Sequence, residues 1–170
     1  MTATFTICTL PALPSQTARP HGRLALCPVP REAEDFAQVK ALAPDLILSL
    51  TPLSENTALG VPDLPRQLAA LTKQFRAFPI TDYAIPPDHA DWAAVSRAAQ
   101  SVLAAHGTVL THCRGGFGRS GMILLRLMIE GGEDPAAALA RLRATRPGAV
   151  ETAAQLHWAT AGPTEADTDE

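Results

Sequence analysis

Short runs of apolar, β-favouring residues alternate along this chain with longer segments of helical periodicity. The predicted strands are residues 4–10, 24–29, 45–50, 75–80 and 108–112. The predicted helices are residues 32–42, 64–74, 88–106, 119–130, 134–145 and 151–160, with 54–65 expected as a loop. Strands that alternate with helices predict an α/β fold with a central, mostly parallel sheet of four to five strands flanked by helices.

Length and composition favour one folded domain. The chain has 170 residues, of which 46% are hydrophobic and 18% are charged, so it can bury a packed core. We expect a single domain over residues 1–160 and an acidic, flexible tail over 161–170, which holds four of the 17 acidic residues. A net charge of −3 offers no basic surface for a nucleic-acid backbone.

The cysteines and the apolar segments indicate a cellular location. Cys8, Cys27 and Cys113 are too few for a disulfide scaffold, which favours a reducing compartment. The longest apolar stretch, residues 122–129, is too short to span a bilayer, and no positively charged signal segment starts the sequence. The histidines lack metal-ligand spacing. We therefore expect a cytoplasmic protein without a membrane partner, a metal or another cofactor.

A glycine-rich loop at residues 113–118 joins the strand 108–112 to the helix that Arg119 begins. Such a loop directs several backbone N–H groups into one concavity at a helix N-terminus, which suits a phosphate. Arg119 can bind two phosphate oxygens at once. The same positive field favours the thiolate of Cys113. A thiolate beneath a bound phosphate is a nucleophile for phosphorus.

Three other interpretations of this loop fit less well. Residues 116–121 match the G-x-G-x-x-G spacing of dinucleotide sites, but no strand with a ribose-binding acid follows the helix. A phosphate loop of the Walker type would need Lys before Ser120. A buried structural cysteine in a strand-to-helix turn explains Cys113 but not His112 before it or Arg119 after it.

Three motifs together resemble one protein family. His-Cys-x5-Arg-Ser at residues 112–120 is similar to the signature of the cysteine-dependent protein tyrosine phosphatase superfamily, which includes dual-specificity phosphatases. Residues 78–86 resemble the general-acid loop of the atypical, kinase-associated dual-specificity group. Residues 148–155 resemble the glutamine loop of tyrosine phosphatases. The resemblance covers the chain from residue 78 onward, whereas the earlier part matches only in its strand–helix rhythm.

The resemblance implies a role for each residue of these motifs. Cys113 would be the nucleophile, Asp82 the general acid, and Arg119 the ligand of the phosphate and of the equatorial oxygens in the transition state. Ser120 would donate a hydrogen bond to the sulfur, and His112 would orient the loop. The residues that bind the substrate phosphate would be Arg114, Gly115, Gly116, Phe117, Gly118 and Arg119.

Alternatives remain for the acid. Asp82 could be a turn residue, and Asp88 is a rival that we expect to cap the following helix. Asp91 is expected to be exposed in the first turn of that helix.

The glutamine loop departs from the family pattern. Glu151 stands where many tyrosine phosphatases have a glutamine that positions water, while Gln155 keeps the second glutamine. Both are candidate water-positioning residues. We expect Glu151 at the edge of the site, held by Arg114, Arg146 or backbone amides. The alternative is a first-turn Glu favoured by the helix dipole.

The resemblance implies an enzyme that hydrolyses phosphotyrosine and phosphoserine or phosphothreonine in proteins through a phosphocysteine. Its partner would be a phosphorylated protein or a small phosphoester. One alternative is a phosphatase for phosphoinositides, nucleotides or other small phosphates, although the loop lacks the lysines of inositide-directed relatives. A non-enzymatic phosphate-binding module is another, although binding alone needs neither a thiol nor an acid. Cys8 or Cys27 could form a disulfide with Cys113 after oxidation, but core packing is favoured for both.

Overall fold

The computed structural model describes residues 4–14 and 22–163. Its centre is a five-stranded sheet in the order β1-β2-β5-β3-β4. The strands are β1 (Cys8–Pro11), β2 (Arg23–Cys27), β3 (Leu46–Ser49), β4 (Gln74–Ala77) and β5 (Thr108–His112). Strands β2, β5, β3 and β4 run parallel, and only β1 is antiparallel to its neighbour. The predicted α/β fold with a mostly parallel sheet is confirmed.

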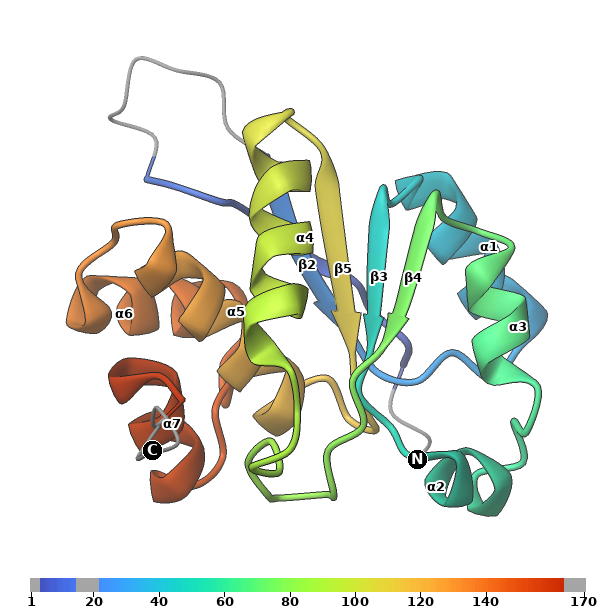
Figure 1. Ribbon diagram of the computed structural model, residues 1–170. Helices are drawn as coiled ribbons and strands as arrows, with labels where there is room; N and C mark the ends of the chain where they lie inside the picture. The colour runs from blue at the N-terminus through green and yellow to red at the C-terminus, as the bar shows by residue number, and fades with distance from the viewer. Residues whose placement is uncertain (1–3, 15–21, 164–170) are drawn as a thin grey trace, which may run out of the picture.

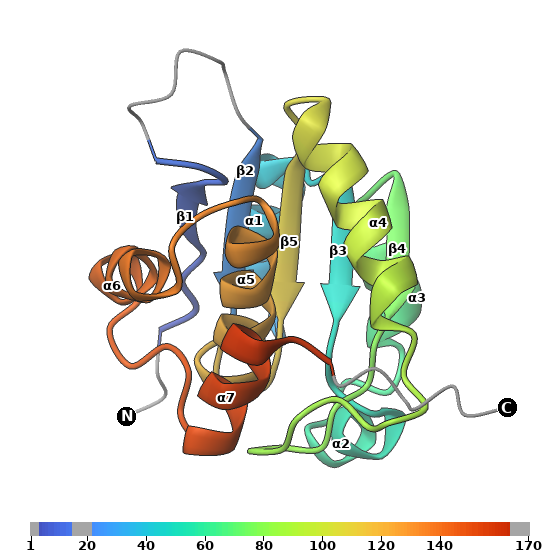
Figure 2. The ribbon, with the colours of Figure 1, turned by 60° about the vertical axis from the view of Figure 1, so that its left-hand side comes forward.

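Helices cover both faces of the sheet (Figures 1 and 2). Helices α1 and α3 lie on one face, and α4, α5, α6 and α7 lie on the other. The short helix α2 lies beyond the ends of the strands. The helices are α1 (Ala33–Leu42), α2 (Leu53–Ala58), α3 (Leu64–Ala69), α4 (Trp92–Ala104), α5 (Gly118–Glu130), α6 (Pro135–Thr145) and α7 (Ala153–Ala161).

Alternate residues of the central strands build two separate cores. Leu24 and Leu26 of β2 pack with the helices on the α5 face, whereas Ala25 and Cys27 pack on the α1 and α3 face. Because both faces are covered, these strands are apolar on both sides, which explains why they appear in the sequence as continuous apolar runs.

Several element boundaries differ from the sequence prediction. The expected loop 54–65 contains helix α2, which is too short to show helical periodicity. Helix α4 begins at Trp92 because the Asp91 carboxylate accepts a hydrogen bond from Ala94 N at 3.0 Å, so Asp91 rather than Asp88 is the cap. Helix α7 begins after Thr152, which caps it, so Glu151 precedes the helix. Of the expected acidic tail, residues 164–170 lie outside the described residues.

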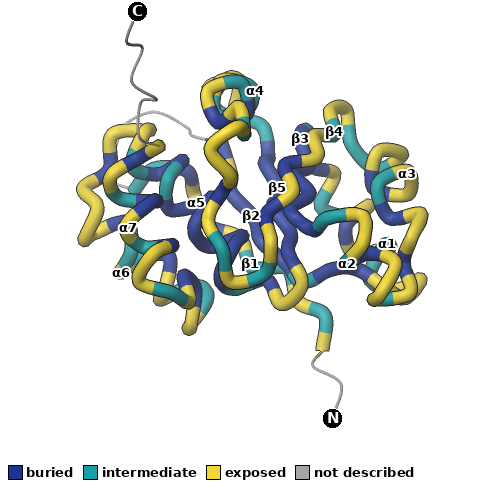
Figure 3. Tube along the Cα trace, turned by 60° about the horizontal axis from the view of Figure 1, so that its bottom comes forward, coloured by how far each residue is buried: buried dark blue, intermediate teal, exposed yellow. Residues whose placement is uncertain are grey.

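The carboxyl ends of the four parallel strands meet at one edge, where the connections after them gather (Figures 1 and 3). These connections include the loop after β5, helix α2 after β3, and the segment from β4 to α4. In open α/β sheets ligands bind at this edge. Within the described parts of the chain, no helix is long and apolar enough to cross a membrane.

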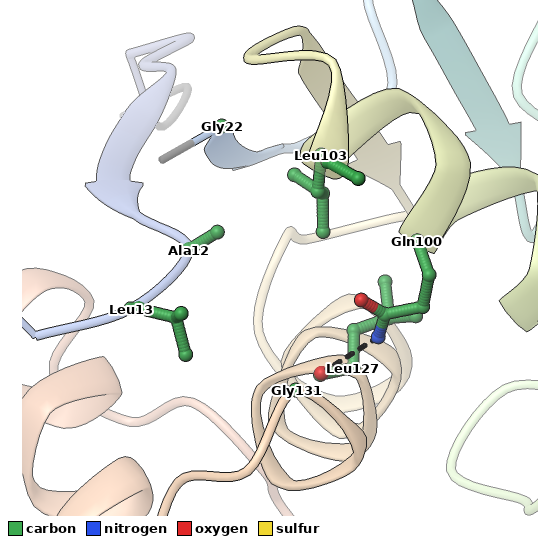
Figure 4. A pocket seen from close by; sticks show the side chains of 8 residues that line it. Ala12, Leu13, Gly22, Gln100, Leu103, Leu127 and Gly131 are labelled. Atoms are coloured by element: carbon green, nitrogen blue, oxygen red, sulfur yellow. Dashed lines mark hydrogen bonds between the residues drawn. The ribbon is translucent and has the colours of Figure 1, made fainter. Parts of the chain in front are cut away.

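A hollow of about 190 Å³ lies near the amino end of β2, away from this edge (Figure 4). Among the described side chains that line it, Gln100 alone is polar, and it donates to Leu127 O at 3.0 Å. The hollow therefore holds no acid, base or nucleophile for catalysis.

Candidate active site

In the loop between β5 and α5, the carbonyl groups of residues 114–117 accept hydrogen bonds from segments outside the loop. Val29 N donates to Arg114 O at 3.2 Å, and Val150 N donates to Phe117 O at 3.1 Å. Arg146 donates to Gly115 O and to Gly116 O, each at 3.0 Å, and its guanidinium lies 3.7 Å from the centre of the Phe117 ring.

The N–H groups of the same loop face the concavity instead. Within residues 4–14 and 22–163, no protein group accepts a hydrogen bond from the amides of Arg114, Gly115 or Phe117. Gly116 adopts φ +72°, and a Cβ there would lie 2.6 Å from the carbonyl carbon of Cys27. The loop is therefore a cradle of free donors at the start of a 13-residue helix, which suits a tetrahedral anion.

The Cys113 sulfur lies at the bottom of this cradle. Gly116 N donates to Sγ at 3.3 Å, and the Ser120 hydroxyl is 3.2 Å from it. Cys113 is only 3% exposed, so a reagent reaches it through the cradle. The sulfur is thus contacted by two groups that can donate a hydrogen bond to it.

Arg119 is buried beside the sulfur and is held by its two terminal nitrogens. Nη1 donates to Glu55 Oε2 at 2.7 Å and to Ile80 O at 2.9 Å, and Nη2 donates to Glu55 Oε1 at 2.8 Å. Burial opposes the charge, but Glu55, with Cys113 and Asp82, raises the pKa of this guanidinium above its ordinary value. In the described part of the chain Nε has no acceptor, so it remains free for a ligand.

The Asp82 carboxylate reaches the same guanidinium from the segment after β4. Oδ1 lies 2.9 Å from Arg119 Nη2 and accepts from Tyr83 N at 3.1 Å. The Asp82 side chain is about one-third exposed, at 36%. The structure thus brings Asp82 to Arg119, although residues 78–86 and 112–120 are separate motifs in the sequence.

The chain matches the model of the Swiss Army Knife protein DSP-PTPase phosphatase domain over residues 20–159. It belongs to this phosphatase family.

Solved structures with the same fold include kinase associated phosphatase carrying a serine in place of its catalytic cysteine, with 21% identity, TM-score 0.75 and 94% of each chain covered. The active form of Tk-PTP has 26% identity and TM-score 0.65, covering 83% of this chain and 94% of the other. PTPMT1 in complex with PI(5)P has 14% identity and TM-score 0.64, covering 81% and 88%. Comparison with curated protein sequences gave no match. The chain is accordingly a cysteine-dependent phosphatase of the tyrosine and dual-specificity type.

His112 of the phosphatase lies under the cradle and away from the concavity. Its Nε2 is 2.6 Å from Ser49 Oγ, and its Nδ1 is 3.5 Å from Cys113 O. Burial lowers the pKa of the His112 imidazole to about 4, so the ring is neutral at neutral pH. His112 is thus placed to support the loop from below, with Ser49 as a partner that the sequence analysis did not identify.

Glu151 lies beside the first residue of α5. A Cβ on Gly118 would collide with Glu151 Oε1, so the carboxylate borders the end of the cradle. No ion pair joins Glu151 to a described residue, and Arg146 binds the loop carbonyls instead of the expected Glu151. The carboxylate lies beside the start of α5, where the positive end of the helix dipole favours a negative charge.

Gln155 lies in the first turn of α7 and is fully buried. Its Oε1 accepts from Glu151 N at 3.0 Å and from Thr152 N at 3.2 Å. Its Nε2 donates to Ala84 O at 3.2 Å. Both polar atoms of the side-chain amide are therefore engaged with protein.

The remaining candidates are Asp88, Cys8 and Cys27. Asp88 borders a groove of about 250 Å³, between the segment after β4 and the tryptophans of α4 and α7. Cys27 is buried, and burial raises the pKa of its thiol, while Cys8 is partly buried; both are free thiols. Among the described residues, no group of His, Cys, Asp and Glu could hold a metal ion.

Glu55 is the functional candidate that the sequence analysis missed. It lies in α2, a helix that was not predicted, and its carboxylate binds an arginine 64 residues later in the chain. Neither its residue type nor its surroundings in the sequence indicated this contact. An acidic residue shortly after a parallel strand, at the edge where the cradle lies, is the one signal that was present.

Proposed function

We propose that this phosphatase hydrolyses phosphotyrosine, phosphoserine and phosphothreonine in proteins, with Cys113 as nucleophile and Asp82 as general acid. The observation that carries the proposal is the cradle: the amides of Arg114, Gly115 and Phe117 have no acceptor among the described residues, and Gly116 N and the Ser120 hydroxyl lie against the Cys113 sulfur. A substrate phosphate would accept from these amides and from Nε and Nη2 of Arg119, taking the place of the Asp82 carboxylate at Nη2.

In the first step the thiolate attacks phosphorus, and the bond from phosphorus to the leaving oxygen breaks. Asp82 gives its proton to that oxygen, which leaves as an alcohol or phenol. Arg119 and the amides stabilise the charge on the equatorial oxygens. Ser120 donates to Sγ and steadies the charge on sulfur before attack.

In the second step water attacks the phosphocysteine. Asp82 takes a proton from the water, the bond between sulfur and phosphorus breaks, and inorganic phosphate leaves with the thiolate restored. We assign the positioning of this water to Glu151, whose carboxylate borders the cradle, because the Gln155 amide is engaged elsewhere.

A phosphatase for phosphoinositides or other small phosphates is the second candidate. One neighbour by fold was solved in complex with PI(5)P. Charge around the cradle argues for protein substrates, because Arg119 and Arg146 are already engaged and only Arg114 offers an exposed, unpaired guanidinium in the described loop. A multiply phosphorylated headgroup would need more cations than this.

The experiment that tests the proposal is phosphate release from matched phosphotyrosine and phosphoserine peptides, a phosphoinositide and a nucleotide, with Cys113→Ser as the control. We expect peptide turnover to exceed turnover of the small phosphates and to be lost in Cys113→Ser. Faster turnover of the inositide or nucleotide than of every peptide would contradict the choice of substrate. An absence of any turnover would favour a module that only binds phosphate.

We also propose that residues 1–160 form the single catalytic domain, with 161–170 as an appended acidic segment. The match to the phosphatase domain over residues 20–159 supports this division. The free thiols of Cys8, Cys27 and Cys113 support a reducing, cytoplasmic location.

A further inference from the structure

Two buried side chains hold the segment that carries Asp82, one on each side of it. Arg119 Nη1 donates to Ile80 O at 2.9 Å, and Gln155 Nε2 donates to Ala84 O at 3.2 Å. Asp82 lies midway between the two carbonyl groups along the chain. We propose that Gln155 is a positioning residue, which tethers the Asp82 segment over the cradle and so sets the position of the proton donor. The proposal rests on the role of Asp82 proposed above.

The orientation of the Gln155 amide is determined by its partners. Its oxygen accepts from two backbone N–H groups, those of Glu151 and Thr152, and its nitrogen faces the Ala84 carbonyl. A flipped amide would place donors against donors and an oxygen against an oxygen. Since Gln155 is fully buried, water does not replace a lost partner, and each of these bonds constrains the geometry.

Gln155 connects the tethered segment to a well-supported part of the fold. It lies in the first turn of α7, where Gln155 N donates to the Thr152 cap at 3.0 Å. Helix α7 packs along α5, the helix that begins at the cradle. A movement of the acid segment relative to the cradle would therefore break the bond between Gln155 and Ala84.

The tethered segment needs such support because its own conformation is unfavourable. Tyr83, directly after Asp82, adopts φ +61°, a region that bulky side chains rarely occupy. One local hydrogen bond, from Ala84 N to Thr81 O at 2.9 Å, closes the turn, while the Tyr83 side chain is 61% exposed. Strained backbone of this kind persists only where surrounding contacts hold it. For this segment those contacts include the bonds from Arg119 to Ile80 O and from Gln155 to Ala84 O, besides the bond from Ile80 N to Leu50 O.

A phosphate in the cradle would remove a third contact of this segment, the ion pair of Asp82, and leave the two backbone tethers in place. When phosphate replaces Asp82 at Arg119 Nη2, the ion pair that holds Asp82 against the cradle is lost. The Gln155 bond does not involve the cradle and remains. Gln155 thus holds Asp82 near the leaving oxygen at the stage when the proton is transferred.

The test compares Gln155→Glu and Gln155→Met with Thr152→Ala. Gln155→Glu keeps an acceptor for the two amides and, when ionised, places a second acceptor opposite Ala84 O, whereas Gln155→Met removes both functions. Thr152→Ala weakens the start of α7 and leaves the tether intact. Each variant is assayed on a phosphoserine peptide, which has a poor leaving group, and on an activated aryl phosphate, both alone and combined with Asp82→Asn.

We expect kcat/KM of both Gln155 variants to fall about 10- to 100-fold on the phosphoserine peptide, as for a catalytic group displaced by about 1 Å. On the aryl phosphate, which needs little protonation, the loss should stay below about threefold. In the Asp82→Asn background neither Gln155 variant should add a further loss, and Thr152→Ala should resemble the parent enzyme. If Gln155→Glu does not fold, the same comparison of the two substrates is made with Gln155→Met alone.

Equal losses on the two substrates, additive losses with Asp82→Asn, or the same loss in Thr152→Ala would overturn the tether. The role of Asp82 is judged separately, from Asp82→Asn alone. If that variant loses activity equally on both substrates, the acid assignment and the tether are both wrong. If it discriminates between the leaving groups and the Gln155 variants do not, only the tether is wrong.

Discussion

The Glu55 carboxylate binds both terminal nitrogens of Arg119, at 2.7 and 2.8 Å, while Nε has no acceptor among the described residues. A guanidinium has one plane, so the Glu55 contact decides where its remaining donors point. Arg119 is 1% exposed and the Glu55 side chain is 15% exposed, so solvent screens this pair only weakly. The function of Glu55 would be to hold the Arg119 guanidinium in its binding orientation before the phosphate arrives.

Glu55→Gln should therefore lower activity as well as stability. Breaking a buried ion pair costs roughly 3–5 kcal/mol, reduced here by the partial exposure of Glu55. We expect kcat/KM to fall about 10- to 100-fold on every phosphoester, because Arg119 loses its orientation. Steady-state kinetics well below the melting temperature and urea denaturation measure the two effects.

Glu133→Gln is the matched control for this variant. Glu133 forms a similarly buried two-point pair with Arg141, at 2.8 and 2.9 Å, with no contact to the cradle. This variant should lose stability and keep near-normal kcat/KM. Equal losses of activity in the two variants would show that Glu55 acts through stability alone.

Cys113→Ser should abolish turnover and retain oxyanion binding. The amides of Arg114, Gly115 and Phe117 and Arg119 Nε make no hydrogen bond to the sulfur, so phosphate should still bind, as measured by calorimetry with inorganic phosphate. Arg119→Lys should lose both binding and turnover, because one ammonium cannot satisfy Glu55, Ile80 O and a phosphate together. Steady turnover by Cys113→Ser preparations free of contaminating phosphatase would exclude the covalent route.

Local patterns predicted the cradle, while contacts between distant segments were not predictable. Residues 108–130 form a strand, loop and helix in which each boundary depends on neighbours in the sequence. Glu55, in contrast, binds an arginine that lies 64 positions later in the chain, and Arg146 binds a carbonyl group that lies 30 positions earlier. The sequence shows the charges of Glu55 and Arg146 but not which groups they contact. This is why Arg146 was expected beside Glu151 and instead binds the loop carbonyls.

The residue that caps α4 was also not predictable from the local sequence. Asp88 and Asp91 are both suitable caps, and the choice depends on where the segment after β4 leaves the sheet. That exit is determined by the contacts of the segment with Arg119 and Gln155, which no local pattern contains.

Asp82→Asn should cost about two to four orders of magnitude in kcat/KM on phosphoserine and phosphothreonine peptides, the usual range for general acid catalysis. The loss should shrink on activated aryl phosphates, whose leaving group needs little protonation. A plot of log kcat/KM against leaving-group pKa should become steeper in the variant. A parallel shift of that plot would indicate a structural role for Asp82 and return attention to Asp88.

The free energy of unfolding should fall as the pH drops from about 6.5 towards 4, because His112 is buried as the neutral ring. Its pKa is lowered to about 4 from 6.5, so the unfolded chain binds a proton in this window that the folded protein does not. The slope should approach about 1.4 kcal/mol per pH unit. Urea denaturation between pH 7 and 4.5 measures it, and His112→Asn should flatten the curve. A wild-type curve that is already flat above pH 4.5 would contradict a neutral, buried His112.

Glu151→Gln should change the second chemical step more than the first. The Glu151 carboxylate borders Gly118 at the start of α5, where its charge opposes a bound phosphate and where it can accept a proton or hydrogen bond from water. The amide keeps the shape and removes the charge, so phosphate should bind more tightly while hydrolysis of the phosphocysteine slows. Rapid-quench measurement on an activated aryl phosphate should then show a larger burst relative to steady turnover. If burst and turnover stay as in the parent enzyme and only the melting temperature falls, Glu151 stabilises the start of α7 and takes no part in the reaction.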